Sequence, residues 1–129
     1  CGNDMSSRTI EGENPLYLPQ AKVYDKSGSL GPALVSKQSI GDPQKLAVTL
    51  VIERNGKEVF RGQANTKDMK RDCEYLVGWL VRHNSIPDGT SVMTGTGTIP
   101  PQEFTLAAGD VVHITIDKIG TLTNTVVVV

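Results

Sequence analysis

Residues 46–63 read LAVTLVIERNGKEVFRGQ, and this stretch decides the class of fold that the sequence predicts. Its first half, Leu46–Glu53, is rich in β-branched residues, which favour extended strands. Asn55-Gly56 follows, and this dipeptide is the strongest short signal for a two-residue hairpin turn. The pattern therefore predicts an antiparallel hairpin with apolar side chains on both faces. Two cross-strand pairs are expected beside the turn: Ile52 with Val59, and Val51 with Phe60.

A helical pattern follows the hairpin. Apolar side chains recur there at intervals typical of one helix face, at Met69, Cys73, Leu76, Val77 and Leu80. Thr66 is expected to cap the start of this helix, and Arg82 and His83 suit its last turn. Tyr75 and Trp79 widen the same face, so we expect them in the core or in a subunit contact rather than around a ligand.

The C-terminal third predicts further strands. Residues 110–117 (DVVHITID) alternate between apolar and mostly polar side chains, as a half-buried strand does. Residues 121–129 (TLTNTVVVV) predict a last strand that becomes continuously apolar at its end. Residues 36–45 resemble a loop. The sequence thus predicts an α+β domain that is mainly β, with at least four strands and one long helix.

The composition indicates an ordinary globular domain. The chain has 129 residues, 38% of them hydrophobic, and a formal net charge of -1. Because nucleic acids and anionic membranes bind concentrated basic faces, we expect neither as a partner. The longest apolar run, Val126–Val129, is far shorter than the roughly 20 residues of a membrane helix. The cysteines, Cys1 and Cys73, form no CxxC pair, so a reducing, cytoplasmic location is expected.

The residues alone suggest two candidate functional sites. The first is the opening segment, which carries the ionisable candidates Asp4, Arg8, Glu11, Glu13 and Lys22. Asp4 has an alternative in an Asx turn, and Lys22 has one as a solvated surface lysine. The second is residues 94–98 (TGTGT), whose glycines suit either a backbone anion nest or a bulged strand end.

Residues 6–22 (SSRTIEGENPLYLPQAK) are too polar for a core but carry apolar groups that a solvated linker lacks. We expect Leu16, Tyr17 and Leu18 to pin this loop to the body of the domain. The prolines restrict its freedom further.

Several blocks of the sequence resemble the C-terminal part of the fumarylacetoacetate hydrolase family. The blocks are GNDMSSR (2–8), PQAK (19–22) followed by SLGPALV (29–35), TGTGTIPP (94–101), and LAAGDVVHITIDKIGTLTNTV (106–126). Within that family, residues 11–22 and 82–101 are most similar to the branch of 2-keto-3-deoxy-D-arabinonate dehydratases. The resemblance extends from the first residue of the chain to the last.

The resemblance implies a fold and an organisation. The fold is a mixed β-sandwich roll with few helices, and residues 1–129 would be the C-terminal part of a single catalytic domain that lacks its N-terminal region. Such domains usually form homodimers. The implied cofactor is a divalent metal, Mg²⁺ or alternatively Ca²⁺ or Mn²⁺, and the implied partner is a small 2-oxo acid substrate.

Carried over position by position, the resemblance makes Asp4 a metal ligand and Lys22 the catalytic lysine that faces the substrate. It places Arg8 and Glu11 in the pocket wall, with Glu11 as an acid or hydrogen-bond partner. Gly95 and Thr96 would bind the substrate carboxylate. The family also holds its metal with a Glu-x-Glu pair that precedes this aspartate, and Glu11-Gly12-Glu13 lies after it. We therefore expect this chain alone to bind magnesium weakly and to have no turnover.

The implied reaction is the removal of water from a 2-keto-3-deoxypentonate to give 2,5-dioxopentanoate. One alternative is a hydrolase of the same family that cleaves a C–C bond of an acylpyruvate or another 1,3-diketo acid. Another alternative is a structural or dimerisation module without catalysis.

Overall fold

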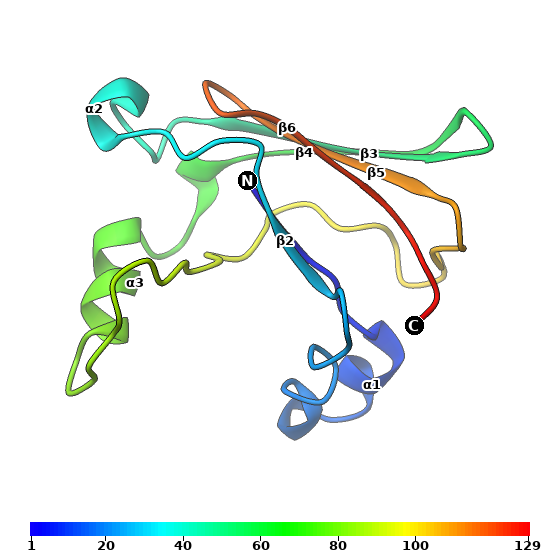
Figure 1. The fold of residues 1–129 in the computed structure, drawn as a ribbon, viewed down its shortest axis with the longest axis horizontal. Helices are drawn as coiled ribbons and strands as arrows, with labels where there is room; N and C mark the ends of the chain where they lie inside the picture. Colours follow the sequence, from blue (N-terminus) through cyan, green and yellow to red (C-terminus); the bar gives the residue numbers. More distant parts are fainter.

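The computed structural model describes residues 1–129 and contains two antiparallel sheets (Figure 1). The larger sheet has the strand order β4-β3-β5-β6, and the smaller one pairs β1 with β2. The small sheet lies beneath the large one in Figure 1, with α1 beyond it. The strands are β1 (Gly2–Asp4), β2 (Gly28–Leu30), β3 (Ala47–Arg54), β4 (Lys57–Asn65), β5 (Val111–Ile116) and β6 (Gly120–Thr125). The predicted α+β class, mainly β, is confirmed.

The predicted hairpin is present as β3 and β4. Asn55 and Gly56 connect the strands with φ values of 52° and 72°, the left-handed conformation that this turn requires. The two predicted pairs are wrong, because Ile52 lies opposite Phe60 and Val51 opposite Arg61. The cause is a shift of register between Ile52 and Glu53, which leaves Val59 without a partner, as in a β-bulge. Val59 is accordingly 42% exposed rather than paired.

The helices are shorter than predicted. The longest, α3 (Cys73–Leu80), has eight residues and begins after Asp72, whose side chain accepts a hydrogen bond from the Tyr75 N–H at 2.7 Å. Thr66 does not cap it, because its hydroxyl donates to the Pro43 carbonyl at 2.7 Å and accepts from the Leu46 N–H. Arg82 and His83 lie beyond the last turn. The remaining helices are α1 (Arg8–Glu13), α2 (Lys37–Ile40) within the predicted loop, and the 3₁₀ turns η1 (Pro15–Tyr17) and η2 (Thr66–Asp68).

The aromatic side chains of α3 lie outside the core of this chain. Tyr75 is 48% exposed and Trp79 is 55% exposed, so their predicted place in the core is wrong. Their rings contact each other with centroids 6.2 Å apart, and the Arg82 guanidinium covers the Trp79 ring at 4.7 Å. Its Cys73, Leu76 and Leu80 side chains are half-buried, and Glu74 forms an ion pair with Lys37 of α2.

The core lies on one face of the large sheet and is small. Eight of the 129 residues are buried, so most apolar side chains stay partly in contact with solvent. The buried apolar side chains are Ala21, Ile40, Leu46, Ile52, Val112 and Leu122. The last strand stops at Thr125, and Val127–Val129 are exposed, which corrects the prediction that β6 continues to the end of the chain.

A buried ion pair ties β3 to the segment before β5. The Arg54 guanidinium donates two hydrogen bonds of 2.8 Å to Asp110, whose side chain is 1% exposed. The same carboxylate accepts the Ala107 N–H at 2.8 Å. These hydrogen bonds, Arg54 foremost, outweigh burial and lower the pKa of Asp110 to about 2. Asp110 is therefore ionised at neutral pH and serves as a structural link.

The prediction that Leu16, Tyr17 and Leu18 hold the loop at residues 6–22 against the domain is wrong. Leu16, Tyr17 and Leu18, which lie in or next to η1, are 82%, 47% and 43% exposed. The loop is held instead by Ala21, which is fully buried and whose carbonyl accepts the Ser7 N–H at 2.9 Å.

Candidate functional site

Two side chains that the sequence singled out separately lie in contact. Asp4 ends β1, where it stands opposite Gly28 of β2, and Lys22 lies in the turns that lead back to β2. The Lys22 Nζ donates to the Asp4 Oδ2 at 2.7 Å and to the Ser6 Oγ at 2.6 Å. The Asp4 carboxylate thus bonds to lysine, and the alternative of an Asx turn is not what the structure contains.

The exposure of this pair limits what it contributes to stability. The side chains of Lys22 and Asp4 are 31% and 47% exposed. Ion pairs that are this accessible contribute about 0–1 kcal/mol, because water screens the charges and both side chains lose freedom. The pair is thus open to a small molecule, and the fold does not depend on it as it does on Asp110.

The side chains of this chain provide only part of the ligands that a metal ion requires. Asp4 fits one ligand position, because its Oδ1 accepts no hydrogen bond and the side chain is accessible. The structure brings no group of three or more His, Cys, Asp or Glu side chains together. Magnesium requires near-octahedral oxygen coordination, which one carboxylate does not provide. The described chain therefore offers one ligand, and a complete site needs oxygen atoms from elsewhere.

Arg8 and Glu11 stand on the short helix α1, and they differ in their contacts. The Arg8 Nη1 donates to the carbonyl of Pro100 at 2.7 Å and more weakly to that of Pro101 at 3.4 Å. It thereby holds the segment at residues 94–101 against the loop that leads from Asp4. Glu11 is exposed and makes no hydrogen bond or ion pair with its side chain. Its predicted role stays a prediction.

The TGTGT segment is irregular backbone with a bend at Gly97 rather than a strand end. Gly95 has a φ of 84°, and the Thr96 hydroxyl accepts the Thr98 N–H at 3.1 Å and lies equally close to the Thr98 carbonyl. The alternative of a bulged strand end is wrong, since no strand includes these residues. The segment lies against β4, where a Cβ added at Gly62 would overlap the Thr98 hydroxyl. No hydrogen bond connects Gly95 or Thr96 to Asp4 or Lys22.

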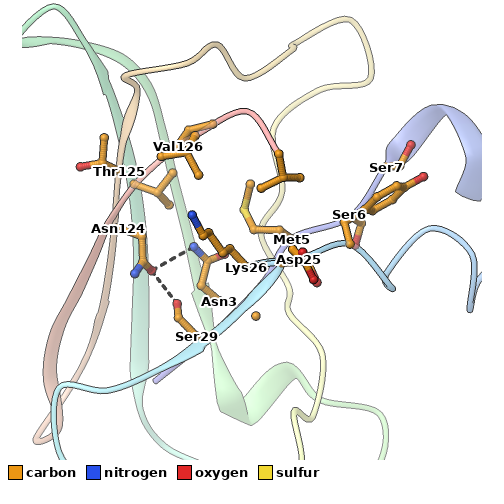
Figure 2. A pocket seen from close by; sticks show the side chains of 16 residues that line it. Asn3, Met5, Ser6, Ser7, Asp25, Lys26, Ser29, Asn124, Thr125 and Val126 are labelled. Carbon is orange, nitrogen blue, oxygen red and sulfur yellow. Dashed lines mark hydrogen bonds between the residues drawn. The ribbon is translucent and has the colours of Figure 1, made fainter.

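A cleft of about 610 Å³ opens between the two sheets (Figure 2). Ser6 lines it, but Asp4 and Lys22 do not. At its inner end the Asn124 Oδ1 accepts hydrogen bonds from the Asn3 Nδ2 at 3.2 Å and from the Ser29 hydroxyl at 2.7 Å (Figure 2). Asn3 and Asn124 were not predicted as site residues, although both stand in the sequence blocks quoted above. They join β1 and β2 to β6 and so fix where Asp4 lies.

No helix in the structure is both long enough and apolar enough to span a bilayer, the longest having eight residues.

Comparison with known proteins identifies the family of this chain. A model described as fumarylacetoacetate hydrolase, C-terminal, matches residues 1–127. A probable 2-keto-3-deoxyxylonate dehydratase of Haloferax volcanii is 50% identical over 128 residues, which are 99% of this chain and 44% of the relative. The 2-dehydro-3-deoxy-D-arabinonate dehydratase of Saccharolobus solfataricus is 45% identical over 93% of this chain and 40% of its own length.

The fold is shared with a solved structure. A 2-keto-3-deoxy-D-arabinonate dehydratase, complexed with magnesium and 2,5-dioxopentanoate, superposes with a TM-score of 0.93 at 44% identity. The match covers 96% of this chain and 44% of that one, so the chain spans less than half the length of the relatives it matches. From its motifs, its sheets and these matches, the chain belongs to the fumarylacetoacetate hydrolase family.

Proposed function

We propose that this chain is the C-terminal part of the single catalytic domain of a metal-dependent dehydratase. The substrate is a 2-keto-3-deoxypentonate, and the product is 2,5-dioxopentanoate. The observation that carries the proposal is the contact of 2.7 Å between Lys22 and Asp4, which joins an amine to an open carboxylate at an accessible place. The similarity to dehydratases of 2-keto-3-deoxy sugar acids supports the same substrate class.

Asp4 supplies one ligand to Mg²⁺, and other ligands come from parts of the protein outside this chain. The cation, when bound, acts as a Lewis acid that polarises the keto and carboxylate oxygens of a 2-oxo acid. The free Asp4 Oδ1 is the atom available for this bond, while Oδ2 keeps Lys22 in place.

Lys22 moves the proton. Its Nζ, as a neutral amine, takes a proton from C3, next to the keto group, and gives it to the hydroxyl on C4, which leaves as water. A proton then moves from C5 to C3 of the unsaturated product, which gives an enol at C4 and C5. Movement of the enol hydroxyl proton to C4 gives the C5 aldehyde, so the net change is the loss of one water. A lysine held by two hydrogen bonds is oriented for this transfer, since its rotamers are already restricted.

We propose that the remaining predicted residues complete the substrate pocket beside this pair. Arg8 positions residues 94–101 through its hydrogen bonds to Pro100 and Pro101, and we propose that Gly95 and Thr96 bind the substrate carboxylate from that segment. Glu11 stands on the same helix as Arg8 and is proposed as a further polar group of the wall. The expected homodimer and the cytoplasmic location stay predictions.

The test uses the complete protein that carries this chain, with Mg²⁺ and either 2-keto-3-deoxypentonate or an acylpyruvate. We expect 2,5-dioxopentanoate from the first and no cleavage of the second. Asp4→Asn should weaken magnesium binding, measured by calorimetric titration, at least tenfold. The matched control is Asp25→Asn, because Asp25 makes no ion pair.

Cleavage of the acylpyruvate without dehydration would assign the C–C hydrolase activity instead. The absence of both reactions, with unchanged magnesium affinity in Asp4→Asn, would favour the structural module.

A further inference from the structure

Ser6 joins the two residues of the proposed site. Its Oγ accepts the Lys22 Nζ at 2.6 Å, which is slightly shorter than the contact between Lys22 and Asp4. The same hydroxyl lies 3.4 Å from the main-chain carbonyl of Asp4 and donates toward it. A hydroxyl both accepts and donates, so Ser6 connects the ammonium group to the backbone that carries the carboxylate.

The main chain fixes this arrangement from both sides of Ser6. The Met5 N–H donates to the Ser27 carbonyl at 2.8 Å, and the Ser7 N–H donates to the Ala21 carbonyl at 2.9 Å. On the other side, the Ser27 hydroxyl donates to the carbonyl of Lys22 at 3.0 Å. The backbones of the two segments are thus held together independently of the contact between Ser6 and Lys22.

The uncharged Ser6 hydroxyl restrains Lys22 in a different way from the Asp4 carboxylate. An unrestrained lysine side chain has about 1.5–2 kcal/mol of rotamer entropy, and 31% of this one is exposed, so water competes for its ammonium group. A carboxylate shared with a cation holds a neighbouring ammonium less strongly, because the two positive charges repel each other. The Ser6 hydroxyl carries no charge, and its hydrogen bond to Lys22 does not depend on the charge of Asp4.

We propose that Ser6 is a positioning residue, whose hydroxyl holds the Lys22 amine in the orientation needed for proton transfer. The proposal rests on the proposed function, because it concerns the same lysine. In this proposal Ser6 does not contact the substrate and does not transfer a proton in the reaction.

The experiment compares variants in the complete protein with Mg²⁺ and 2-keto-3-deoxypentonate. Ser6→Ala removes the hydroxyl, and Ser6→Cys keeps the approximate volume with a much weaker acceptor. We expect both to lower kcat roughly 10- to 100-fold with KM changed less than threefold, because a misplaced group slows the chemical step more than binding. Ser6→Thr retains the hydroxyl and should restore kcat to within about threefold of the parent.

Ser7→Ala is the matched control. Ser7 precedes α1, but its side chain forms no capping hydrogen bond, so kcat should stay within twofold of the parent. Thermal unfolding of every variant shows whether the chain is folded. If Ser6→Ala is not folded, Ser6→Cys and Ser6→Thr still decide the question.

A second readout needs no turnover and no metal. Limited acetylation of the metal-free protein, followed by peptide mass spectrometry, measures how accessible the Lys22 amine is relative to that of Lys26. We expect Lys22 acetylation to rise severalfold in Ser6→Ala and Ser6→Cys, and to stay at the parent level in Ser6→Thr and Ser7→Ala.

The two readouts separate this proposal from the proposed function. Dehydration by the parent, with kcat and Lys22 acetylation unchanged in the folded Ser6 variants, would overturn the positioning role and leave the dehydratase in place. Increased acetylation in Ser6→Ala, in a protein that does not dehydrate the sugar acid, would support the holding of Lys22 by Ser6 and remove the proposed reaction.

Discussion

Arg54 and Asp110, which are 56 positions apart in the sequence, are joined by two hydrogen bonds of 2.8 Å. The Asp110 side chain is buried, whereas 39% of the Arg54 side chain is exposed. Arg54 also donates to the Thr105 carbonyl at 3.0 Å and lies 5.8 Å from the Phe104 ring. The guanidinium thus fastens the long loop before β5 to the end of β3, and two predictions follow from this link.

Asp110→Asn should destabilise the complete protein by about 1.5–3 kcal/mol, the usual contribution of a hydrogen bond to a charged group. The amide keeps the shape but has a single oxygen acceptor and no charge to offer Arg54. Urea denaturation measures the loss. Asp88→Asn is the matched control, because Asp88 makes no ion pair and is exposed, and an equal shift in both variants would contradict the assignment.

The stability should also depend on pH through the same carboxyl group. The pKa of Asp110 is lowered from 3.8 to about 2 in the folded protein, so the unfolded chain binds this proton more readily. The stabilisation of the folded state by the ionised Asp110 is complete above pH 3.8 and is lost as the pH falls toward 2. Urea denaturation at several pH values should show a smaller decline in Asp110→Asn than in the parent. An unchanged decline would mean that other carboxyl groups are responsible.

Lys22→Ala should reduce kcat at least 100-fold while KM for the sugar acid changes little, since general acid–base groups contribute about 10²–10⁴-fold to rate. Steady-state kinetics with Mg²⁺ present measures both constants. Lys26→Ala provides the comparison, because Lys26 lies in the same loop and makes no ion pair. Unchanged turnover in Lys22→Ala would remove Lys22 from the mechanism.

Gly62→Ala should displace the TGTGT segment from β4. The added Cβ would overlap the Thr98 hydroxyl and come within 3.0 Å of the Phe60 ring, an overpacking that costs about 1–3 kcal/mol. We expect a lower urea midpoint and a several-fold higher KM, because Gly95 and Thr96 move with Thr98. Gly78→Ala meets nothing within 4 Å and should not lower either stability or affinity. A Gly62→Ala protein with the parent's midpoint and KM would show that the segment does not depend on this close approach.

Local patterns in the sequence predicted the four strands of the large sheet, but neither β1 nor β2, and they did not predict the exact pairing of β3 with β4. The Asn55-Gly56 turn follows from a preference of two residues for left-handed backbone, which is a local property. The bulge that leaves Val59 unpaired depends on how β4 twists against β3, and no short pattern encodes it. Thr66 was mistaken for a helix cap for a similar reason. Its hydroxyl bonds to Pro43, which is distant in sequence and offers a better partner than a helix that starts at Cys73.

The candidate site was predictable where a known motif names its residues. Asp4 and Lys22 were named through the family resemblance, and the structure brings their side chains into contact. Ser6 stands in the same motif, but nothing in the letters shows that its hydroxyl reaches Lys22. The contacts of Asn3 with Asn124, and of Arg54 with Asp110, form between distant segments and become visible only when the sheets are assembled.

The hydrogen bond between Asn3 and Asn124 also sets an order of events during synthesis. The partners are 121 positions apart, and Asn124 lies in the last strand. A ribosome therefore makes β1 long before β6, and the hydrogen bond between them forms only after β6 has left the exit tunnel. Until then the small sheet lacks this link to the large one, and Asp4, at the end of β1, is without the support that fixes its place.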